Sequence, residues 1–383
     1  MPRNAAVPAA GTPASRRLAP EIAAETAADQ PAGGRRSSEA MHLRVLIDGR
    51  PLVGERTGIG VHTAEIARRL EVEPVPLIAT HAPIADRAGI EHCRFRVDRA
   101  PAGVLWQQIL LPRLAPEADV LWGPHGTLPL AWKKPAVVTL HDFTSIRMPG
   151  AHRLKTILSF NTFIARSLNG AERIAAVSRL VADEAVRGFG VPRAKIEIVP
   201  NGVDAFFSPG DGSEGDYILF VGTIEPRKGI DDLIEVWRTL DAPRPRLVLC
   251  GARGWRVRLP RDEGIEITGY VDRGALRDLY RHARLFVYPS RYEGFGIPPL
   301  EALACGAPVV ATRTGAIPEF ADNAALLVRP GDRTALRDAI ARALGDDALR
   351  RELRARGPER ASRFRWETSA AIMRDLLAAA ARA

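Results

Sequence analysis

The stretch RYEGFGIPPLEALACGAPVV, residues 291–310, indicates a loop, a short helix and a strand in succession. Two prolines suit the first turn of the helix and a Gly-Ala-Pro sequence suits its end, so we predict a helix over residues 298–305. Apart from Glu301, the side chains of this segment are apolar on every face. Such a helix is typical of a segment packed between a sheet and its neighbours.

Glu301 needs an explanation, because an ionised carboxylate buried without partners is costly. We predict that it meets strong hydrogen-bond donors such as the hydroxyls of a ligand, and capping of its own helix is the alternative. Glu293 lies eight positions earlier in EGFG, residues 293–296. The backbone N–H groups of this segment come just before a helix N-terminus, where phosphate or sugar oxygens bind well.

Outward from this stretch the chain alternates aliphatic runs with helical patterns, which indicates parallel sheets covered by helices on both faces. The predicted strands of the first half are RVLID (44–48), DVLW (119–122), AVVTL (136–140), IAAVS (174–178) and KIEIVP (195–200). Those of the second half are YILFV (217–221), RLVLC (246–250), IEIT (265–268) and LFVYP (285–289). The predicted fold class is α/β, with two doubly wound, Rossmann-like domains and a ligand cleft at the carboxyl ends of the strands.

The turn-rich segment FFSPGDGSEGD, residues 206–216, predicts a hinge between the two domains. We expect a disordered leader, a first domain, a second domain and a C-terminal helix that packs back on the first domain, over residues 1–40, 41–205, 206–365 and 366–383. Met41 directly precedes the first strand and is an alternative start of translation.

Composition narrows the class of protein. The 383 residues are 46% hydrophobic and 26% charged, which is typical of a soluble globular protein. The net charge of +9 favours anionic partners or reflects a solvated basic surface, and without a basic cluster interleaved with aromatic residues nucleic acid is the least favoured partner. Three separated cysteines, Cys93, Cys250 and Cys305, predict buried thiols in a reducing compartment. With no long apolar run and no signal-peptide pattern, a cytoplasmic location is expected.

A second group of candidate residues occurs in GTIEPRKG, residues 222–229. Gly222 directly follows a strand, and Arg227 and Lys228 stand just before a predicted helix. Cations are unfavourable at a helix N-terminus, which already carries partial positive charge. We therefore predict that this pair binds an anion, with solvent-screened surface positions as the alternative.

Two further features flank predicted strands. TGIG, residues 57–60, lacks the third glycine of a dinucleotide fingerprint, so we expect a tight turn that a substrate can approach before a helix over residues 61–70. His125 and His141 follow strands whose ends should face the cleft, although lone histidines are often structural. The sequence shows no metal-ligand spacing and no G-x-S-x-G elbow, which disfavours metal-dependent and serine-hydrolase chemistry.

Together these motifs resemble the signature of retaining nucleotide-sugar glycosyltransferases of family 4, which adopt the two-domain GT-B fold. YEGFGIPPLEALACGAPVV, with seven residues between Glu293 and Glu301, carries most of the resemblance. The resemblance covers nearly the whole chain after Met41 through TGIG, LHD (140–142), AVS (176–178), VPNGVD (199–204), FVGTIEPRKG (220–229), TGYV (268–271) and GAIPE (315–319).

The resemblance implies a role for each motif. Arg227 and Lys228 would hold the donor diphosphate and stabilise the leaving nucleotide, and Glu301 would accept hydrogen bonds from the ribose hydroxyls. Glu293 would orient the donor sugar, and His141 would contact that sugar from the opposite domain. The donor-binding set would be completed by Gly58, Gly60, Gly222, Val271, Gly294, Phe295, Gly296 and Ile297, with Val271 meeting the base through its main chain.

The resemblance also implies a reaction. A hexose would pass, with retention and without a metal or other cofactor, from a nucleoside diphosphate sugar to a glycan or lipid-linked acceptor. The TGIG and FVGTIEPRKG motifs resemble those of bacterial mannosyltransferases of surface polysaccharide synthesis, so GDP-mannose is the expected donor. An epimerase-like enzyme of the same fold and a non-catalytic sugar-nucleotide binding subunit remain the alternatives. A basic helix around His152–Arg166 is a candidate for contact with an anionic membrane, with an ordinary packed helix as the alternative.

Overall fold

The computed structural model describes residues 41–383 apart from residues 55, 101–102, 115, 149, 151–153 and 255–261, and the side chains of residues 154–160 are not described. The predicted leader, residues 1–40, lies outside the described residues.

The first half of the described chain forms a seven-stranded sheet in the order β5-β4-β2-β6-β7-β8-β9, with every neighbouring pair parallel. The strands are β2 (Val45–Asp48), β4 (Leu77–Thr80), β5 (Arg94–Val97), β6 (Val120–Gly123), β7 (Ala136–Leu140), β8 (Arg173–Ala176) and β9 (Ile196–Ile198). Two short strands, β1 (Met41–His42) and β3 (Val72–Glu73), pair with each other beside it. The chain order reverses between β2 and β6, which is where doubly wound sheets open a ligand crevice.

The second half repeats this arrangement in a six-stranded parallel sheet of order β12-β11-β10-β13-β14-β15. Its strands are β10 (Tyr217–Val221), β11 (Arg246–Cys250), β12 (Ile265–Gly269), β13 (Leu285–Tyr288), β14 (Val309–Thr312) and β15 (Ala325–Val328). Here the order reverses between β10 and β13. The predicted class, α/β with two Rossmann-like sheets, is confirmed.

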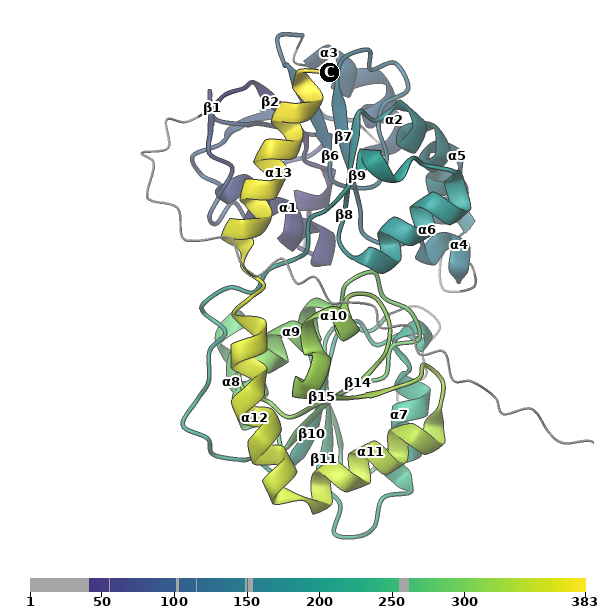
Figure 1. The fold of residues 1–383 in the computed structure, drawn as a ribbon, viewed down its shortest axis with the longest axis vertical. Coiled ribbons are helices and arrows are strands. Elements are labelled where there is room, and N and C mark those ends of the chain that lie inside the picture. Colours follow the sequence, from purple (N-terminus) through teal and green to yellow (C-terminus); the bar gives the residue numbers. More distant parts are fainter. Residues whose placement is uncertain are drawn as a thin grey trace, which may run out of the picture. The chain divides into compact units, whose positions relative to one another are not determined.

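Helices connect the strands in both halves (Figure 1). Those of the first half are η1 (Arg50–Leu52), α1 (Gly58–Arg68), α2 (Gly103–Leu105), η2 (Trp106–Leu110), α3 (Leu111–Leu114), α4 (Thr144–Arg147), α5 (Leu154–Gly170), α6 (Arg179–Phe189) and η4 (Arg193–Lys195). Those of the second half are η5 (Pro226–Lys228), α7 (Ile230–Arg238), α8 (Arg273–His282), α9 (Ile297–Ala304), α10 (Ile317–Ala321), η6 (Asp322–Ala324), α11 (Arg333–Gly345) and α12 (Asp347–Ala361).

The last helix, α13 (Trp366–Ala381), returns to the first sheet, where the yellow ribbon of Figure 1 runs beside α1. Trp366 is 2% exposed and belongs to the same hydrophobic cluster as strand residues of the first half. A Trp at the start of an otherwise Ala-rich helix supplies the large apolar area that anchors the helix.

Several element boundaries differ from those predicted. Helix α1 begins at Gly58, so the glycines of TGIG form its first turn instead of a separate loop. Strands β4 and β5 escaped prediction. β5 lies at the sheet edge, exposes its arginines and has no apolar run, and β4, between β5 and β2, has only four residues. The predicted hinge is packed at its start, because Phe207 is 7% exposed and contacts Tyr280 edge to face.

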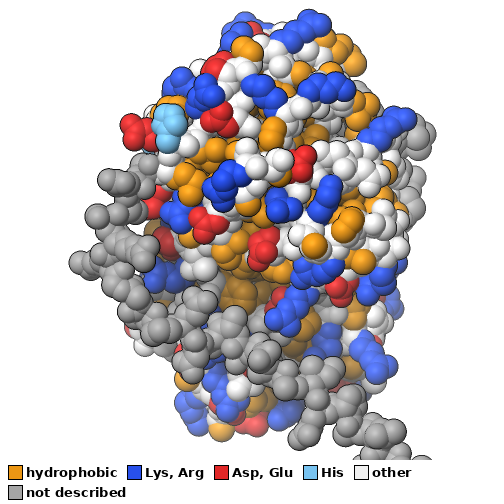
Figure 2. Space-filling model, turned by 45° about the horizontal axis from the view of Figure 1, so that its top comes forward, with side chains coloured by type: hydrophobic (Ala, Val, Ile, Leu, Met, Phe, Trp, Pro, Cys, Tyr) orange, Lys and Arg blue, Asp and Glu red, His pale blue; other side chains and the backbone are white. Residues whose placement is uncertain are grey.

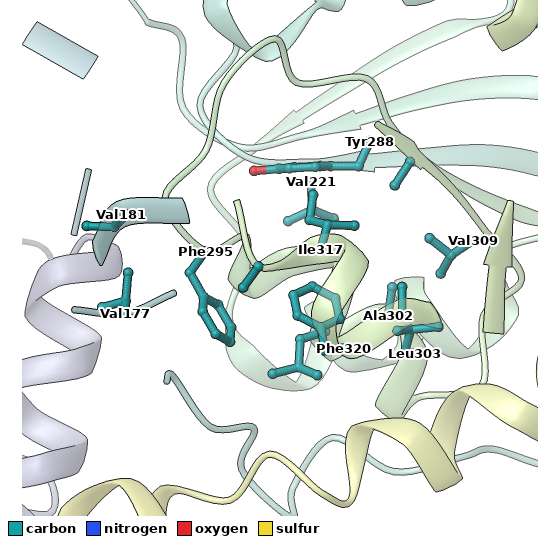
Figure 3. Close-up of a cluster of buried hydrophobic side chains, with 14 of the residues drawn as sticks. Val177, Val181, Val221, Tyr288, Phe295, Ala302, Leu303, Val309, Ile317 and Phe320 are labelled. Atoms are coloured by element: carbon teal, nitrogen blue, oxygen red, sulfur yellow. The ribbon is translucent and has the colours of Figure 1, made fainter. Parts of the chain in front are cut away.

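Hydrophobic side chains of both halves join in one buried cluster. Figure 3 shows Val177 and Val181, from the end of β8 and from α6, beside Phe295 of the loop before α9. Phe320 of α10 packs against Phe295 with ring centroids 5.4 Å apart. Through the cluster that includes Val177 and Val181, the EGFG loop packs against the first half of the chain.

Two composition-based predictions concern burial and charge. All three cysteines are buried thiols, as predicted. On the face shown in Figure 2, basic side chains are interspersed with acidic ones. The net positive charge is therefore spread over that face rather than concentrated in a single basic patch.

Candidate active site

A pocket of about 440 Å³ lies where strand ends of both sheets meet. Most of the residues singled out from the sequence line it, namely Gly58, His141, Gly222, Arg227, Lys228, Glu293, Gly294, Phe295, Gly296, Ile297 and Glu301. Its size is in the range that holds small ligands. Motifs separated by more than 200 residues thus converge on one pocket.

Two of the predicted donor-binding residues do not line this pocket. Gly60 is buried, and a Cβ placed on it would come within 2.6 Å of the carbonyl oxygen of Pro51, so its small size serves the packing of α1 on η1. Val271 follows β12 outside the pocket, next to Tyr270, whose side chain is exposed.

The centre of the pocket is a buried ion pair between Lys228 and Glu293. The Lys228 Nζ lies 2.5 Å from Glu293 Oε1 and donates to the Tyr288 hydroxyl at 2.8 Å. Tyr288 and Ser290 also donate to the same carboxylate oxygen, at 3.0 Å and 2.6 Å. Burial raises the pKa of Glu293, but the charges of Lys228 and Arg227 outweigh burial and leave that pKa below its usual range. Glu293 is therefore a carboxylate held by several donors.

Arg227 lies beside this pair. Its Nη1 is 3.5 Å from Glu293 Oε1 and donates to the backbone carbonyl of Tyr292 at 3.2 Å, while Nη2 donates to Glu225 at 2.6 Å. Both predicted cations thus already face carboxylates in the protein. The anion expected beside them from the sequence is supplied in part by Glu293, 65 residues further along the chain from Lys228.

A second group of ion pairs joins the segment that carries Arg227 and Lys228 to the loop that carries Glu293. Arg291, next to the EGFG loop, donates its backbone N–H to the Arg227 carbonyl at 2.9 Å. Its guanidinium group and that of Arg333 both bind Asp232, at 3.0 Å and 2.6 Å. Asp232 is only 3% exposed. These contacts fix the position of η5 relative to the loop after β13. They also give Asp232, one of the two acidic residues in the first turn of α7, a structural role.

Glu301 projects from α9 into the same pocket. It is partly exposed there and accepts a hydrogen bond from the hydroxyl of Tyr280 at 3.0 Å. Burial raises its pKa to about 7, although the Tyr280 hydrogen bond acts in the opposite direction. Tyr280 is fully buried and was not predicted as a partner. The capping alternative does not apply, because Glu301 lies in the second turn of α9, which begins at Ile297.

Two glycines of the EGFG loop are required by contact and conformation. A Cβ on Gly294 would lie 1.6 Å from the carbonyl oxygen of His141, so only glycine lets the loop meet the first half of the chain. Gly296 has φ of 97° and precedes α9, a conformation that favours glycine. Gly296 and Ile297 line the pocket at the start of this eight-residue helix, where the first backbone N–H groups have no partner within the helix.

The first half of the chain contributes neutral histidines. His141 donates from Nε2 to the Pro124 carbonyl at 2.9 Å, which leaves Nδ1 as an acceptor. Burial, followed by the nearby ring of His62, lowers the pKa of His141 well below its usual value. His62 is fully buried, with its ring 4.8 Å from that of His141 and its Nδ1 2.7 Å from Asn201 Oδ1. Burial lowers the pKa of His62 to about 4.

Sequence reasoning missed several residues of this side of the site. Asn201 lines the pocket and lies in VPNGVD, so the motif containing it was found without its role. His62 gave no signal because it stands inside a helical pattern. His125, the other candidate histidine, is exposed and does not line the pocket.

Neither a metal cluster nor a membrane-spanning helix is found in the described part of the chain. Within those residues no three His, Cys, Asp or Glu side chains gather as metal ligands would. Nor does any described helix have the length and apolar character needed to cross a bilayer. The side chains of the first part of the predicted basic helix, His152–Arg166, lie outside the described residues.

Family models match both halves of the chain. A model described as Glycosyltransferase Family 4 matches residues 56–205, and one described as Glycosyl transferases group 1 matches residues 204–360. The O-antigen chain mannosyltransferase B of Escherichia coli is 31% identical over 369 residues, which cover 85% of this chain and 97% of that protein. The O-antigen chain mannosyltransferase RfbU of Salmonella typhimurium is 27% identical over 223 residues, 56% of this chain and 62% of that protein.

Solved structures share the fold. Anabaena Alr3699/HepE in complex with UDP and glucose superposes with a TM-score of 0.70 at 20% identity, covering 88% of this chain and 100% of that one. WaaG, a glycosyltransferase involved in lipopolysaccharide biosynthesis, superposes with a TM-score of 0.68 at 15% identity, covering 88% and 99%.

The two parallel sheets and their structural neighbours define a GT-B fold, as the motifs predicted. The chain belongs to the family 4 glycosyltransferases, of the mannosyltransferase type. It is therefore a sugar-transferring enzyme.

Proposed function

We propose that this enzyme transfers mannose from GDP-mannose, with retention of configuration and without a metal ion, to a glycan or lipid-linked acceptor in surface polysaccharide synthesis. The observation that carries the proposal is the convergence of Arg227, Lys228, Glu293 and Glu301 with His141 around one pocket. The similarity to O-antigen chain mannosyltransferase B supports the choice of sugar.

The charges of the pocket suit a nucleoside diphosphate. Arg227 and Lys228 are pre-positioned by Glu225, Glu293 and the Tyr292 carbonyl, so they need little reorganisation to meet a diphosphate. As the bond between sugar and phosphate breaks, negative charge grows on the leaving nucleotide, and two fixed cations stabilise it. Glu301 then offers its carboxylate to the ribose hydroxyls.

The hydrogen bonds of the pocket's carboxylates favour front-face displacement over a double displacement. A double displacement needs a carboxylate nucleophile beneath the sugar. Glu293 Oε1 accepts from Lys228, Tyr288 and Ser290, and an oxygen held by three donors is a weak nucleophile. Asp142, which also lines the pocket, accepts from the backbone N–H of Thr144 at 2.8 Å. In front-face displacement the departing phosphate takes the proton of the acceptor hydroxyl, so no such nucleophile is required.

His141 is suited to bind the sugar as a neutral ring that does not change its charge near neutral pH. Its depressed pKa keeps the ring neutral at physiological pH, with Nδ1 as an acceptor for a sugar hydroxyl. A neutral ring at this position orients the sugar through a hydrogen bond and does not attract the negatively charged phosphate.

The test is thermal stabilisation by a panel of nucleoside diphosphates and their sugars, followed by product analysis. We expect GDP and GDP-mannose to raise Tm selectively, and a new α-glycosidic bond to form in the presence of EDTA. Stabilisation by another nucleotide would overturn the choice of base, and loss of activity in EDTA would overturn metal independence. A C2-inverted sugar would indicate the epimerase-like alternative, and binding without any turnover would indicate a non-catalytic subunit.

Contact with an anionic membrane through the segment around His152–Arg166 also stays a proposal. Liposome flotation tests it. Equal recovery of the protein with neutral and acidic vesicles would contradict it.

A further inference from the structure

Tyr292 occupies an unusual place between the two halves of the chain. Its phenol lies outside the pocket, on the side of the EGFG loop that faces α6 and the start of α4. The hydroxyl donates to Glu184 Oε2 at 2.5 Å and accepts the backbone N–H of Phe143 at 3.1 Å. A single oxygen therefore joins the second half of the chain to two elements of the first.

The partners of this hydroxyl are themselves fixed. The Glu184 side chain is 5% exposed and also accepts from Arg147 Nε at 2.9 Å. Phe143 is 2% exposed and stacks on Phe189 of α6 with centroids 5.2 Å apart. Because Glu184 and Phe143 are held in place, both hydrogen bonds to the Tyr292 hydroxyl form in only one position of the loop that carries Tyr292.

The position of Tyr292 in the chain connects this contact to the pocket on both sides. Phe143 directly follows His141 and Asp142, and Tyr292 directly precedes Glu293. The carbonyl of Tyr292 accepts from Arg227 at 3.2 Å. Tyr292 thus connects the segment of His141 with that of Arg227 and Glu293 without lining the pocket itself.

We propose that Tyr292 is a positioning residue that sets His141 of the first half at its working distance from Arg227 and Glu293 of the second. This inference rests on the proposed function. Binding of the nucleotide part of the donor depends on charged groups of the second half, whereas transfer also needs His141 of the first half in place. Loss of the hydroxyl should therefore lower kcat and leave donor affinity nearly unchanged.

The test compares Tyr292→Phe and Glu184→Gln with Tyr217→Phe. Tyr217 is a matched control, because its hydroxyl donates to the Leu279 carbonyl at 2.8 Å within the second half and away from the pocket. We expect Tyr292→Phe to lose about tenfold or more in kcat, with the dissociation constant of the donor nucleotide within about twofold of the parent. Tyr217→Phe should keep the parental kcat. Glu184→Gln should lose less, and the double variant no more than Tyr292→Phe alone, because both changes break the same contact.

The outcomes separate this inference from the proposed function. If the parent protein makes no glycosidic product, the proposed function fails, whatever the variants do. If the parent is active and Tyr292→Phe matches Tyr217→Phe in kcat, the positioning role is wrong. It is also wrong if donor affinity falls as far as kcat, or if the losses of the two single variants multiply in the double variant. Should Tyr292→Phe fold poorly, Glu184→Gln decides by the same comparison of kcat and donor affinity.

Discussion

The two sides of the pocket are built differently. The side from the second half of the chain is ionic, with Lys228 and Arg227 bound to buried or partly buried carboxylates. We call the side from the first half the neutral side because burial keeps its His62 and His141 uncharged, although Arg56 and Asp142 also line the pocket there. His62 is also hydrogen-bonded to Asn201. This difference indicates separate roles for the two sides. The ionic side suits a charged phosphate, and the neutral side suits sugar hydroxyls because its histidines stay uncharged near neutral pH.

We expect the largest effect from removing a charge on the ionic side. Lys228→Ala leaves Glu293 as a buried carboxylate without its closest partner, so we expect a loss of stability of about 3–5 kcal/mol and a fall in activity of about a hundredfold or more. Chemical denaturation and initial rates measure the two effects. The double change Lys228→Met with Glu293→Gln should restore most of the stability but not the activity. A Lys228→Ala protein with parental stability and parental stabilisation by nucleotides would contradict the ionic role.

A second change tests how closely the two sides must approach. Gly294→Ala places a methyl group where the His141 carbonyl oxygen lies 1.6 Å away, so the loop or the strand end must shift. We expect activity to fall by about tenfold or more, because small displacements of reacting groups are costly. Gly188→Ala is the control, since a Cβ there has no atom within 4 Å among the described neighbours. Equal activities of the two variants would show that the close approach is unnecessary.

The pH dependence of nucleotide binding sharpens the assignment of Glu301. Its pKa of about 7 in the free protein means that a proton is often bound near neutral pH. Ribose hydroxyls that donate to the carboxylate favour the charged form, which lowers the pKa in the complex and releases a proton on binding. Affinity should therefore rise with pH below about pH 7, by up to about tenfold per pH unit, and level off above pH 7. Calorimetry of GDP binding in buffers of different ionisation enthalpy measures the proton release, and Glu301→Gln should lower it by the share that Glu301 contributes. Proton release unchanged in Glu301→Gln would assign it to another group.

The smallest effect is expected on the neutral side. His62→Leu removes the hydrogen bond to Asn201 and the edge contact with His141, so we expect a loss of activity of about tenfold or less and a loss of stability of about 1–3 kcal/mol. His282→Leu, which removes a histidine bound to a backbone carbonyl of its own helix, is the control. Since the pKa of His62 is about 4, the activity profile between pH 6 and pH 8 should keep its shape in the variant. A changed profile would mean that His62 titrates in the working range.

The charged side of the pocket was the more predictable from sequence. Arg227, Lys228 and Glu293 stand in short motifs directly after strands, and parallel strands bring such motifs to one edge. Glu301 was conspicuous because its neighbours are apolar. On the neutral side Gly58 and His141 were found, but His62 was missed because it looks like any polar residue of an amphipathic helix. Gly60 was assigned to the donor from its motif, although its small size serves the packing against Pro51.

The sequence by itself determined the alternation of strands and helices, the two parallel sheets and the positions where acidic and basic residues follow a strand. Periodicity and local turn chemistry are properties of neighbouring residues, so they can be read along the chain. Only the tertiary structure decided that Lys228 pairs with Glu293, that Tyr280 binds Glu301 and that Tyr292 joins Glu184. These partners are separated by 65, 21 and 108 residues, and their contacts depend on strand order and on the packing of the two halves, which no local pattern encodes.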